Sequence, residues 1–331
     1  MNSINMRAVV AVNSELPLEL QSSVIPAPQA GQVLVKVIAS GVNPLDTKIS
    51  QGKGAHARQP FPAVLGMDLA GEVVAVGEGV TSFQIGEEIY GMAGGIGGQQ
   101  GSLAEYIAVD ANLISRKPNN LSMREAAALP LVFITAWEGL VDRANVQAGQ
   151  KVLVQGGAGG VGHIVVQIAK ARGAQVFATG SAKSCEVIES FGATAIDYNK
   201  QDPVEYMNQY TDGEGFDIVY DTVGGATLDA SFGVVKVYSG HVVSCLGWGE
   251  HKLAPLSFRG ATYSGVFTLL PLLTGKGRKH HGEILAEATR LAESGQLRVL
   301  LDDRKFTLDT VNEAYAIVSG GTANGKIVVD I

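Results

Sequence analysis

Two patterns of hydrophobic positions divide the chain near residue 125. Before that point, short runs of β-branched residues alternate with glycine and proline, as in VLVKVIASGVNP, AGEVVAVGEGV, GEEIYGM and AEYIAVD. Runs of this length and spacing predict the strands of a small, barrel-like β region. After residue 125, strand-like runs alternate with segments of helical period, which is typical of βαβ units and a parallel sheet.

The second region contains the clearest single elements. KVLVQ at 151–155 predicts a short apolar strand, and the apolar positions from Gly160 to Arg172 recur at helical spacing up to the stop signal at Gly173. Further strands are expected at 175–179, 216–224 and 241–247, a helix over 308–318, and a terminal strand in KIVVDI. We therefore predict an α/β fold with one domain at 1–125, completed by 269–331, and a second at 126–268.

Composition narrows the class of protein. The 331 residues are enough for two domains, and a formal net charge of −7 excludes a protein that holds nucleic acid through a basic face. Two cysteines, Cys185 and Cys245, exclude a disulfide framework and fit a reducing compartment. The first residues contain no secretory pattern, and the apolar stretch around Pro271 is shorter than the roughly 20 residues that cross a bilayer. We expect a soluble cytoplasmic protein.

The motif GAGGVG spans Gly157 to Gly162 and matches G-x-G-x-x-G between the strand at 151–155 and the following helix. In this context the first glycine permits a tight turn, Gly159 lets the backbone approach a pyrophosphate, and Gly162 allows close packing of helix on strand. Gly160 and Val161 lie between Gly159 and Gly162, and the N-terminus of the following helix offers N–H groups to phosphates. The motif predicts dinucleotide binding, and the alternative is a glycine-rich turn that binds nothing.

The end of the second strand indicates which dinucleotide. NAD enzymes of this kind place Asp or Glu there to bind the ribose 2′-hydroxyl. This chain has TGSAK, with Thr179, Gly180, Ser181 and Lys183, and its first carboxylate is Glu186 in the next helix. Hydroxyls and a lysine suit a 2′-phosphate, so the sequence favours NADPH over NADH. Lys183 as a solvated side chain is the alternative. Tyr198, after the third strand, is either a stacking partner for adenosine or an ordinary strand-end tyrosine.

Several motifs together resemble one family. GVNPLD (41–46), LGMDLAGEV (65–73), GSLAEY (101–106), AAALPLVFITAWEGL (126–140), VLVQGGAGGVG and GKIVV (325–329) are similar to segments of the medium-chain dehydrogenase/reductase superfamily, in its quinone oxidoreductase branch. The resemblance covers essentially the whole chain. It implies a GroES-like catalytic domain, a Rossmann domain that binds NADP(H), an active-site cleft between them, and a homodimer or a higher assembly.

The resemblance also raises the question of a metal. Zinc-dependent members bind zinc through Cys, His and Cys, and the aligned positions here are Asn43, Met67 and roughly Leu131, none of which is a zinc ligand. The structural zinc lobe of the family needs four cysteines, and this chain has two. Its six histidines show no metal-binding spacing. We therefore expect no metal. Without a Lewis acid, a quinone or an α,β-unsaturated carbonyl is the better acceptor, because conjugation spreads the incoming charge.

Candidate catalytic residues follow from the segments that the resemblance places at the cleft. Asn43 either donates a hydrogen bond to the substrate oxygen or to the nicotinamide edge, or stabilises its own turn. Asp46 is expected to orient the loop or a water molecule. Asp68 is expected to be structural. Lys48 stands where many relatives carry tyrosine, and is a proton donor or a solvated side chain. Thr135 touches the nicotinamide ring or bonds its own helix.

The strand ends of the second domain complete the expected site. Val223, Cys245 and Gly247 lie at the C-terminal ends of later strands of the sheet, at the edge where a dinucleotide lies, so they should face the nicotinamide half. We read Cys245 as a small apolar filler. The expected function is a zinc-independent, NADPH-dependent reductase of quinones or enones. The alternatives are a zinc-type alcohol dehydrogenase and a nucleotide-binding protein without useful turnover.

Overall fold

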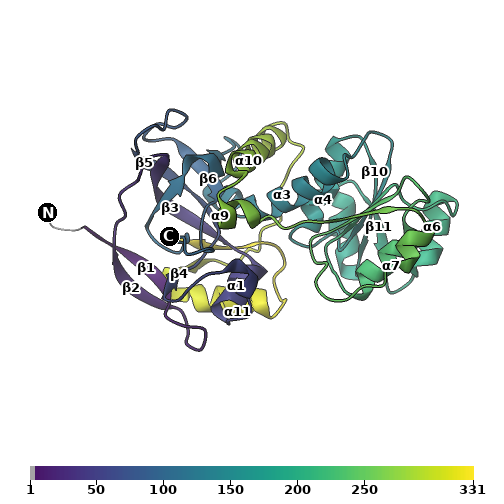
Figure 1. Cartoon of the computed structure of the whole chain (residues 1–331), viewed down its shortest axis with the longest axis horizontal. Coiled ribbons are helices and arrows are strands. Elements are labelled where there is room, and N and C mark those ends of the chain that lie inside the picture. The colour runs from purple at the N-terminus through teal and green to yellow at the C-terminus, as the bar shows by residue number, and fades with distance from the viewer. Residues whose placement is uncertain (1–3) are drawn as a thin grey trace. The chain divides into compact units, whose positions relative to one another are not determined.

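The computed structural model describes residues 4–331 (Figure 1). The described chain divides into two compact units, the first made of residues up to Leu131 together with Leu269–Ile331 and the second of Val132–Thr268. The chain thus leaves the first unit after Leu131, inside helix α3 (Pro130–Trp137), rather than after residue 125. The mixed α/β architecture that the sequence predicts is confirmed, with a GroES-like unit and a Rossmann-like parallel sheet.

The first unit is built from two sheets. One sheet runs in the order β15-β16-β3-β5-β6-β8, with β7 also paired to β3, and the other has the order β2-β1-β4. Their strands are β1 (Asn5–Ala11), β2 (Glu19–Val24), β3 (Gln32–Val42), β4 (Ala63–Val64), β5 (Asp68–Val76), β6 (Glu88–Met92), β7 (Tyr106–Asp110), β8 (Ile114–Arg116), β15 (Phe306–Thr307) and β16 (Ile327–Asp330).

Alternating apolar residues of these strands form the core of the first unit. On β3, Val33, Val35 and Val37 are buried at every second position, and they pack with Leu69, Val73 and Ile89 of β5 and β6. The period of two is the strand signal seen in the sequence. Helices α1 (Pro44–Ser50), α2 (Met123–Ala127), α9 (Leu270–Thr274), α10 (Arg278–Glu293) and α11 (Val311–Ser319) complete the unit. Helices α1 and α11 lie side by side (Figure 1).

The second unit is one six-stranded parallel sheet in the order β11-β10-β9-β12-β13-β14. The order reverses at β9, the strand that precedes the glycine motif, and this reversal is the switch point at which doubly wound sheets bind ligands. The strands are β9 (Lys151–Gln155), β10 (Gln175–Gly180), β11 (Thr194–Asp197), β12 (Ile218–Asp221), β13 (His241–Ser244) and β14 (Thr262–Gly265).

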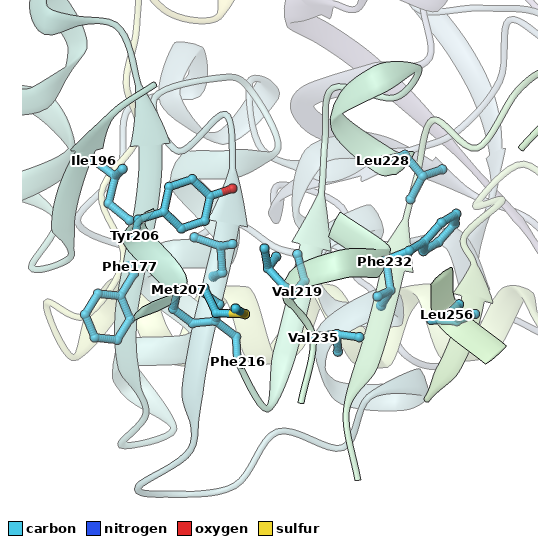
Figure 2. Close-up of a cluster of buried hydrophobic side chains, with 13 residues drawn as sticks. Phe177, Ile196, Tyr206, Met207, Phe216, Val219, Leu228, Phe232, Val235 and Leu256 are labelled. Atoms are coloured by element: carbon cyan, nitrogen blue, oxygen red, sulfur yellow. The ribbon is translucent and has the colours of Figure 1, made fainter. Parts of the chain in front are cut away.

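One face of this sheet carries the cluster in Figure 2. Leu153, Phe177, Val219 and Val242 stand in register on neighbouring strands, so they form one apolar row across the sheet. Helices α6, α7 and α8 cover the row with Tyr206, Met207, Leu228, Phe232 and Leu256. The helices of this unit are α4 (Gly162–Ala171), α5 (Cys185–Ser190), α6 (Pro203–Thr211), α7 (Ala226–Val234) and α8 (Ala254–Phe258). Within residues 4–331, no helix combines the length and the apolar character needed to cross a bilayer.

Candidate active site

In the first unit, the candidate site begins where β3 ends and α1 starts. Asn43 is the residue before Pro44, and its backbone N–H donates to Asp46 Oδ2 at 2.8 Å. An acidic side chain three residues into a helix commonly caps the first turn in this way. Both side chains are fully buried. The local motif GVNPLD therefore turns the chain and directs two polar side chains into the interior.

Asp68, the first residue of β5, connects this turn to a distant part of the chain. Its Oδ2 accepts from Asn43 Nδ2 at 2.8 Å, and its Oδ1 accepts from the Leu131 backbone N–H at 3.0 Å. Met67 beside it is fully buried. The three positions that the family resemblance aligns, 43, 67 and 131, are thus brought to one place in the first unit, and a carboxylate joins two of them.

Lys326 supplies the positive charge of this cluster. Its side chain is buried, and its ammonium donates to the Val42 carbonyl at 3.1 Å and to Asn43 Oδ1. The Asn43 carboxamide is therefore bound at both ends, by Lys326 at the oxygen and by Asp68 at the nitrogen. This geometry makes Asn43 a brace of the strand–helix junction. A direct contact between Asn43 and a substrate stays a prediction.

Burial sets the protonation of the cluster. It raises the pKa of Asp46 to about 7 and the pKa of Asp68 to about 6, and the positive charge of Lys326 opposes both shifts. Burial also lowers the pKa of Lys326, against the pull of the two carboxylates. Because one ammonium serves two buried carboxylates, the pKa of both carboxyl groups lies above the ordinary value, and that of Asp46 is the more strongly raised.

Two polar atoms of the cluster are unsatisfied. Within the described residues, Asp46 Oδ1 and Tyr315 Oη are buried without a hydrogen-bond partner. They come from α1 and α11, the two adjacent helices, and the charge of Asp46 helps burial to raise the pKa of Tyr315. Burial of a carboxyl oxygen that accepts no hydrogen bond costs less free energy when the carboxyl group is neutral than when it is charged. This agrees with the raised pKa of Asp46.

The remaining two catalytic candidates occupy different surroundings. Lys48 is exposed on α1, on the side of the helix away from the buried Asp46. Thr135 belongs to the second unit, where α3 buries it, and its carbonyl accepts from the Tyr220 hydroxyl at 2.6 Å. The structure thus brings Asn43 and Asp46 together, whereas Lys48 is displayed to solvent.

The glycine motif forms the expected turn after β9. The residue with a positive φ is Gly156, at 78°, so the tight turn depends on the glycine before the motif rather than on Gly157. Gly157 instead packs against β10, where an added Cβ would lie 2.5 Å from Ala178 Cβ. An added Cβ on Gly162 would lie 2.1 Å from the Gly156 carbonyl oxygen, whereas one on Gly159 would meet only that oxygen, at 3.2 Å. Gly159 is therefore the least confined of the three glycines, as close approach of a pyrophosphate requires.

Gly160 and Val161 lead directly into α4, whose first residue is Gly162. Thr179 is buried, and its hydroxyl donates to Gln155 Oε1 at 2.8 Å and accepts from the Gly156 N–H at 3.0 Å. Its role in the structure is thus to hold the glycine turn onto β10. A contact between Thr179 and the 2′-phosphate of NADPH stays a prediction.

The end of β10 gathers the other candidates for the adenosine half. Ser181 Oγ lies 3.0 Å from Ser184 Oγ, Lys183 is exposed, and the Tyr198 N–H donates to the Gly180 carbonyl at 3.2 Å. Tyr198 is 58% exposed, so its ring is available to a ligand. The nearby carboxylate of Asp197 accepts from the Asn199 N–H at 3.0 Å and lies 3.9 Å from Lys200 Nζ.

Asp221, at the end of β12, is a buried residue that the sequence analysis missed. Its carboxylate accepts from the Val223 and Gly224 N–H groups and from the Ser244 hydroxyl, at 3.1, 3.0 and 2.6 Å. It thereby joins the ends of β12 and β13 and shapes the loop that carries Val223.

The other two candidates near the ends of these strands are Cys245 and Gly247. Burial raises the pKa of Cys245 to about 12, so this thiol is unreactive, as expected for a filler. Gly247 lies against Tyr263, whose hydroxyl would meet an added Cβ at 2.2 Å.

Comparison with known proteins assigns the family. A family model described as "Alcohol dehydrogenase GroES-like domain" matches residues 29–119, and one described as "Zinc-binding dehydrogenase" matches residues 191–329. A 2-methylene-furan-3-one reductase of Solanum lycopersicum is 38% identical over 94% of this chain and 75% of its own length. The chain belongs to the medium-chain dehydrogenase/reductase superfamily. Within that superfamily it falls in the quinone oxidoreductase-like branch.

Two further relatives refine this placement within the superfamily. An NADPH-dependent alkenal/one oxidoreductase of Arabidopsis thaliana, described as chloroplastic, is 37% identical over 94% of this chain and 75% of its own length. The crystal structure of an alcohol dehydrogenase superfamily protein from Novosphingobium aromaticivorans has 55% identity and a TM-score of 0.96, and it covers 98% of this chain and 99% of the other.

The side chains of this medium-chain dehydrogenase/reductase can be compared with what a metal site requires. Among residues 4–331, no group of three or more His, Cys, Asp and Glu side chains is arranged to hold a metal ion. The position of residue 43 is filled by a carboxamide already bound to Lys326 and Asp68. In the sequence, Lys326 stands out only as part of the GKIVV segment. Its partner Asn43 lies 283 residues away, and no local pattern indicates such a contact.

Proposed function

We propose that this protein is an NADPH-dependent reductase that acts on quinones or α,β-unsaturated carbonyl compounds without a catalytic metal. The observation that carries the proposal is the cluster of Asn43, Asp68 and Lys326. The cluster offers no thiolate or imidazole, and its carboxylate, Asp68, is already bonded to the Asn43 carboxamide and to the Leu131 N–H. The relatives named as alkenal/one oxidoreductase and 2-methylene-furan-3-one reductase support an oxidoreductase with this substrate class and with NADP(H).

Chemistry without a Lewis acid favours a conjugated acceptor. Reduction of an isolated ketone creates a localised alkoxide, which needs a metal or a strong acid beside it. In an enone or a quinone, the electrons that arrive at the β-carbon or the ring are delocalised onto a carbonyl oxygen, and the product is a weaker base. Hydrogen-bond donors alone then stabilise that charge. A proton from solvent or from Lys48 completes the reduced product.

The residues of the second unit fit NADP(H). Gly156, Gly159 and Gly162 form a turn without side chains at the start of α4, where free N–H groups would bind a pyrophosphate. Ser181 and Lys183 would hold a 2′-phosphate, and Tyr198 would stack beside the adenosine. Bound there, the cofactor supplies the hydride. The part of the protein is to hold acceptor and cofactor in a productive geometry.

The test is oxidation of NADPH, followed at its own absorbance, with a simple quinone, a short enone and a saturated ketone, each in the presence of EDTA. We expect turnover of the two conjugated acceptors that survives the chelator, and weaker turnover with NADH. Reduction of the saturated ketone alone, abolished by EDTA, would instead establish a zinc-type alcohol dehydrogenase. Binding of NADPH without any turnover would favour a nucleotide-binding protein that is not a reductase.

A further inference from the structure

The chain between β13 and α8 is exposed apart from one residue. From Gly247 to Pro255, each residue is exposed except His251. The side chain of His251 is 12% exposed, whereas Trp248 on the same stretch is 54% exposed. We call residues 245–251 the β13 loop. His251 is the point at which the far end of this loop is attached to the body of the second unit.

His251 is attached to α7 through two contacts. Its Nδ1 lies 2.8 Å from Asp229 Oδ1, and the imidazole donates this hydrogen bond because a carboxylate only accepts. Its ring meets the Phe232 ring edge to face, with centroids 6.4 Å apart and planes at 87°. Phe232 is buried in the apolar cluster of the sheet (Figure 2). A hydrogen bond and a ring contact thus fix the far end of the β13 loop to the core of its unit.

The same imidazole has one polar atom that the fold leaves unsatisfied. Among residues 4–331, His251 Nε2 is one of the few buried side-chain atoms without a hydrogen-bond partner. Such an atom costs free energy, which an apolar ring of similar shape would avoid. Asp229 is half exposed, so water would solvate its carboxylate if the imidazole were absent. Stability alone therefore does not favour a histidine at this position, which indicates that its hydrogen bond has another role.

The other end of the β13 loop lies where the cofactor is expected. β12, β13 and β14 are parallel neighbours, so the loops that follow them leave the same edge of the sheet. An added Cβ on Gly224, after β12, would lie 2.6 Å from the Leu246 carbonyl oxygen. One on Gly247 would lie 2.2 Å from the Tyr263 hydroxyl of β14. A shift of this closely packed loop would therefore displace Gly247, the residue expected beside the nicotinamide half.

We propose that His251 and Asp229 are positioning residues that hold the β13 loop in the conformation that binds the nicotinamide half of NADPH. The inference rests on the proposed function, since it assigns part of the cofactor site of that reductase. The affinity for a ligand falls with the fraction of protein in the binding conformation, and a loop released at His251 lowers that fraction. The adenosine half is expected at β10, which β9 and β12 separate from β13, so its binding does not depend on this loop.

Two variants of His251 separate the hydrogen bond from the ring. His251→Phe keeps a ring against Phe232 but has no donor for Asp229, and His251→Asn keeps an N–H donor at the place of Nδ1 but has no ring. We expect His251→Phe to weaken NADPH binding about fivefold in titration calorimetry, and to leave the affinity for adenosine 2′,5′-bisphosphate unchanged. Its melting temperature should not fall, because the unsatisfied Nε2 is gone. His251→Asn should stay within about twofold of the wild-type affinity for NADPH.

His241→Phe is the matched control at the opposite end of β13. It makes the same substitution and removes a hydrogen bond of 2.9 Å to Ser264 Oγ, and it should change neither affinity. Fluorescence reports on the loop without any ligand, since Trp248 lies on it and Trp137, the other tryptophan of the chain, is 6% exposed. Acrylamide quenching, which therefore reports mainly on Trp248, should rise in His251→Phe but not in His241→Phe or His251→Asn.

Three results would overturn the positioning role. The first is a His251→Phe variant that binds NADPH as the wild-type protein does. The second is an equal loss of affinity for NADPH and for the bisphosphate, since a general structural effect would explain it. The third is the same loss in His251→Asn, which would assign the effect to ring packing. These titrations need no acceptor, so a protein that binds NADPH without turnover refutes the reductase and leaves the test of His251 intact.

Discussion

At the scale of single residues, the main feature is a lysine that is buried among carboxylates. Lys326 binds the Val42 carbonyl and Asn43, and it opposes the charge of Asp68. Removal of one member of a buried charged set leaves the others unpaired, which costs about 3–5 kcal/mol. The cluster therefore both stabilises the first unit and defines where α1 begins.

The variant Lys326→Met tests this role. We expect it to lower the free energy of unfolding by about 3–5 kcal/mol, measured by urea unfolding, because Asp68 and the Asn43 oxygen lose their cation. Lys117→Met is the control, since Lys117 is a half-buried lysine of the same unit, bonded to the Leu121 carbonyl at 2.7 Å and to the exposed Glu88. An equal loss of unfolding free energy in the two variants would mean that the cluster at Asn43 stabilises the unit no more than the contacts of Lys117 do. The double variant Lys326→Met, Asp68→Asn should recover part of the loss.

Asp46 makes a prediction about pH. Its folded-state pKa of about 7 lies above the ordinary value of 3.8, so the folded protein holds a proton that the unfolded chain releases as pH rises above about 4. This contribution to stability is therefore complete at low pH and is lost as pH rises towards and through 7. Asp46→Asn should flatten the fall in melting temperature between pH 5 and pH 8. A residual slope from Asp68 remains, and a slope identical to that of wild type would contradict the assignment.

Lys183 tests the choice of cofactor at one side chain. If it binds the 2′-phosphate, Lys183→Gln should raise the KM for NADPH by about tenfold, as expected for the loss of one charge-assisted contact, and should leave the KM for NADH nearly unchanged. Lys252→Gln, at another exposed lysine of the same unit, is the control. An equal effect on both cofactors would place Lys183 outside the phosphate site.

At the scale of elements, neighbouring glycines have different structural roles in the turn between β9 and α4. An added Cβ on Gly162 would strike the Gly156 carbonyl at 2.1 Å, whereas one on Gly159 would project into open space apart from a 3.2 Å approach to the same oxygen. A folded protein thus tolerates a side chain at Gly159 much better than at Gly162.

We expect Gly159→Val to fold and to bind NADPH at least about tenfold more weakly, measured by fluorescence titration, because the side chain fills the space of the pyrophosphate. Gly162→Ala should lower the melting temperature. Gly233→Ala, at a helical position of the same unit with no atom within 4 Å of the added Cβ, should do neither. Unchanged binding in Gly159→Val would exclude this turn as the phosphate site.

Elements were predictable from sequence where the signal is local. The strand at 151–155 coincides with β9, because a short apolar run between turn residues is typical of a strand buried on both faces of a parallel sheet. The strand expected at 216–224 is shorter, since Asp221 ends β12 by bonding the N–H groups of the following loop. The turn glycine was assigned to Gly157, although the positive φ is at Gly156, because a motif does not reveal backbone angles.

The candidate site was less predictable than the fold. Asn43 and Asp46 were identified as polar residues in a short motif, but their partners Asp68 and Lys326 come from strands far apart in sequence. Whether Asn43 points to a substrate or to a neighbouring strand depends on this tertiary packing. The same holds for Thr179, whose hydroxyl serves the glycine turn.

At the scale of the whole molecule, the chain combines a GroES-like unit and a Rossmann unit of the medium-chain dehydrogenase/reductase superfamily. The buried ammonium of Lys326 belongs to the first unit and the glycine turn to the second. Homodimer formation and a cytoplasmic location stay predictions, which sedimentation analysis and cell fractionation would test.

In the proposed reaction, hydride reaches the conjugated carbon of an acceptor without help from a metal. This step is tested most directly by incubating metal-depleted protein with an enone and NADPH deuterated at the transferring position of the nicotinamide, and by locating the deuterium in the product by NMR. We expect a saturated ketone with deuterium at the β-carbon. Deuterium at the carbonyl carbon of an allylic alcohol, formed only after zinc is restored, would contradict the account.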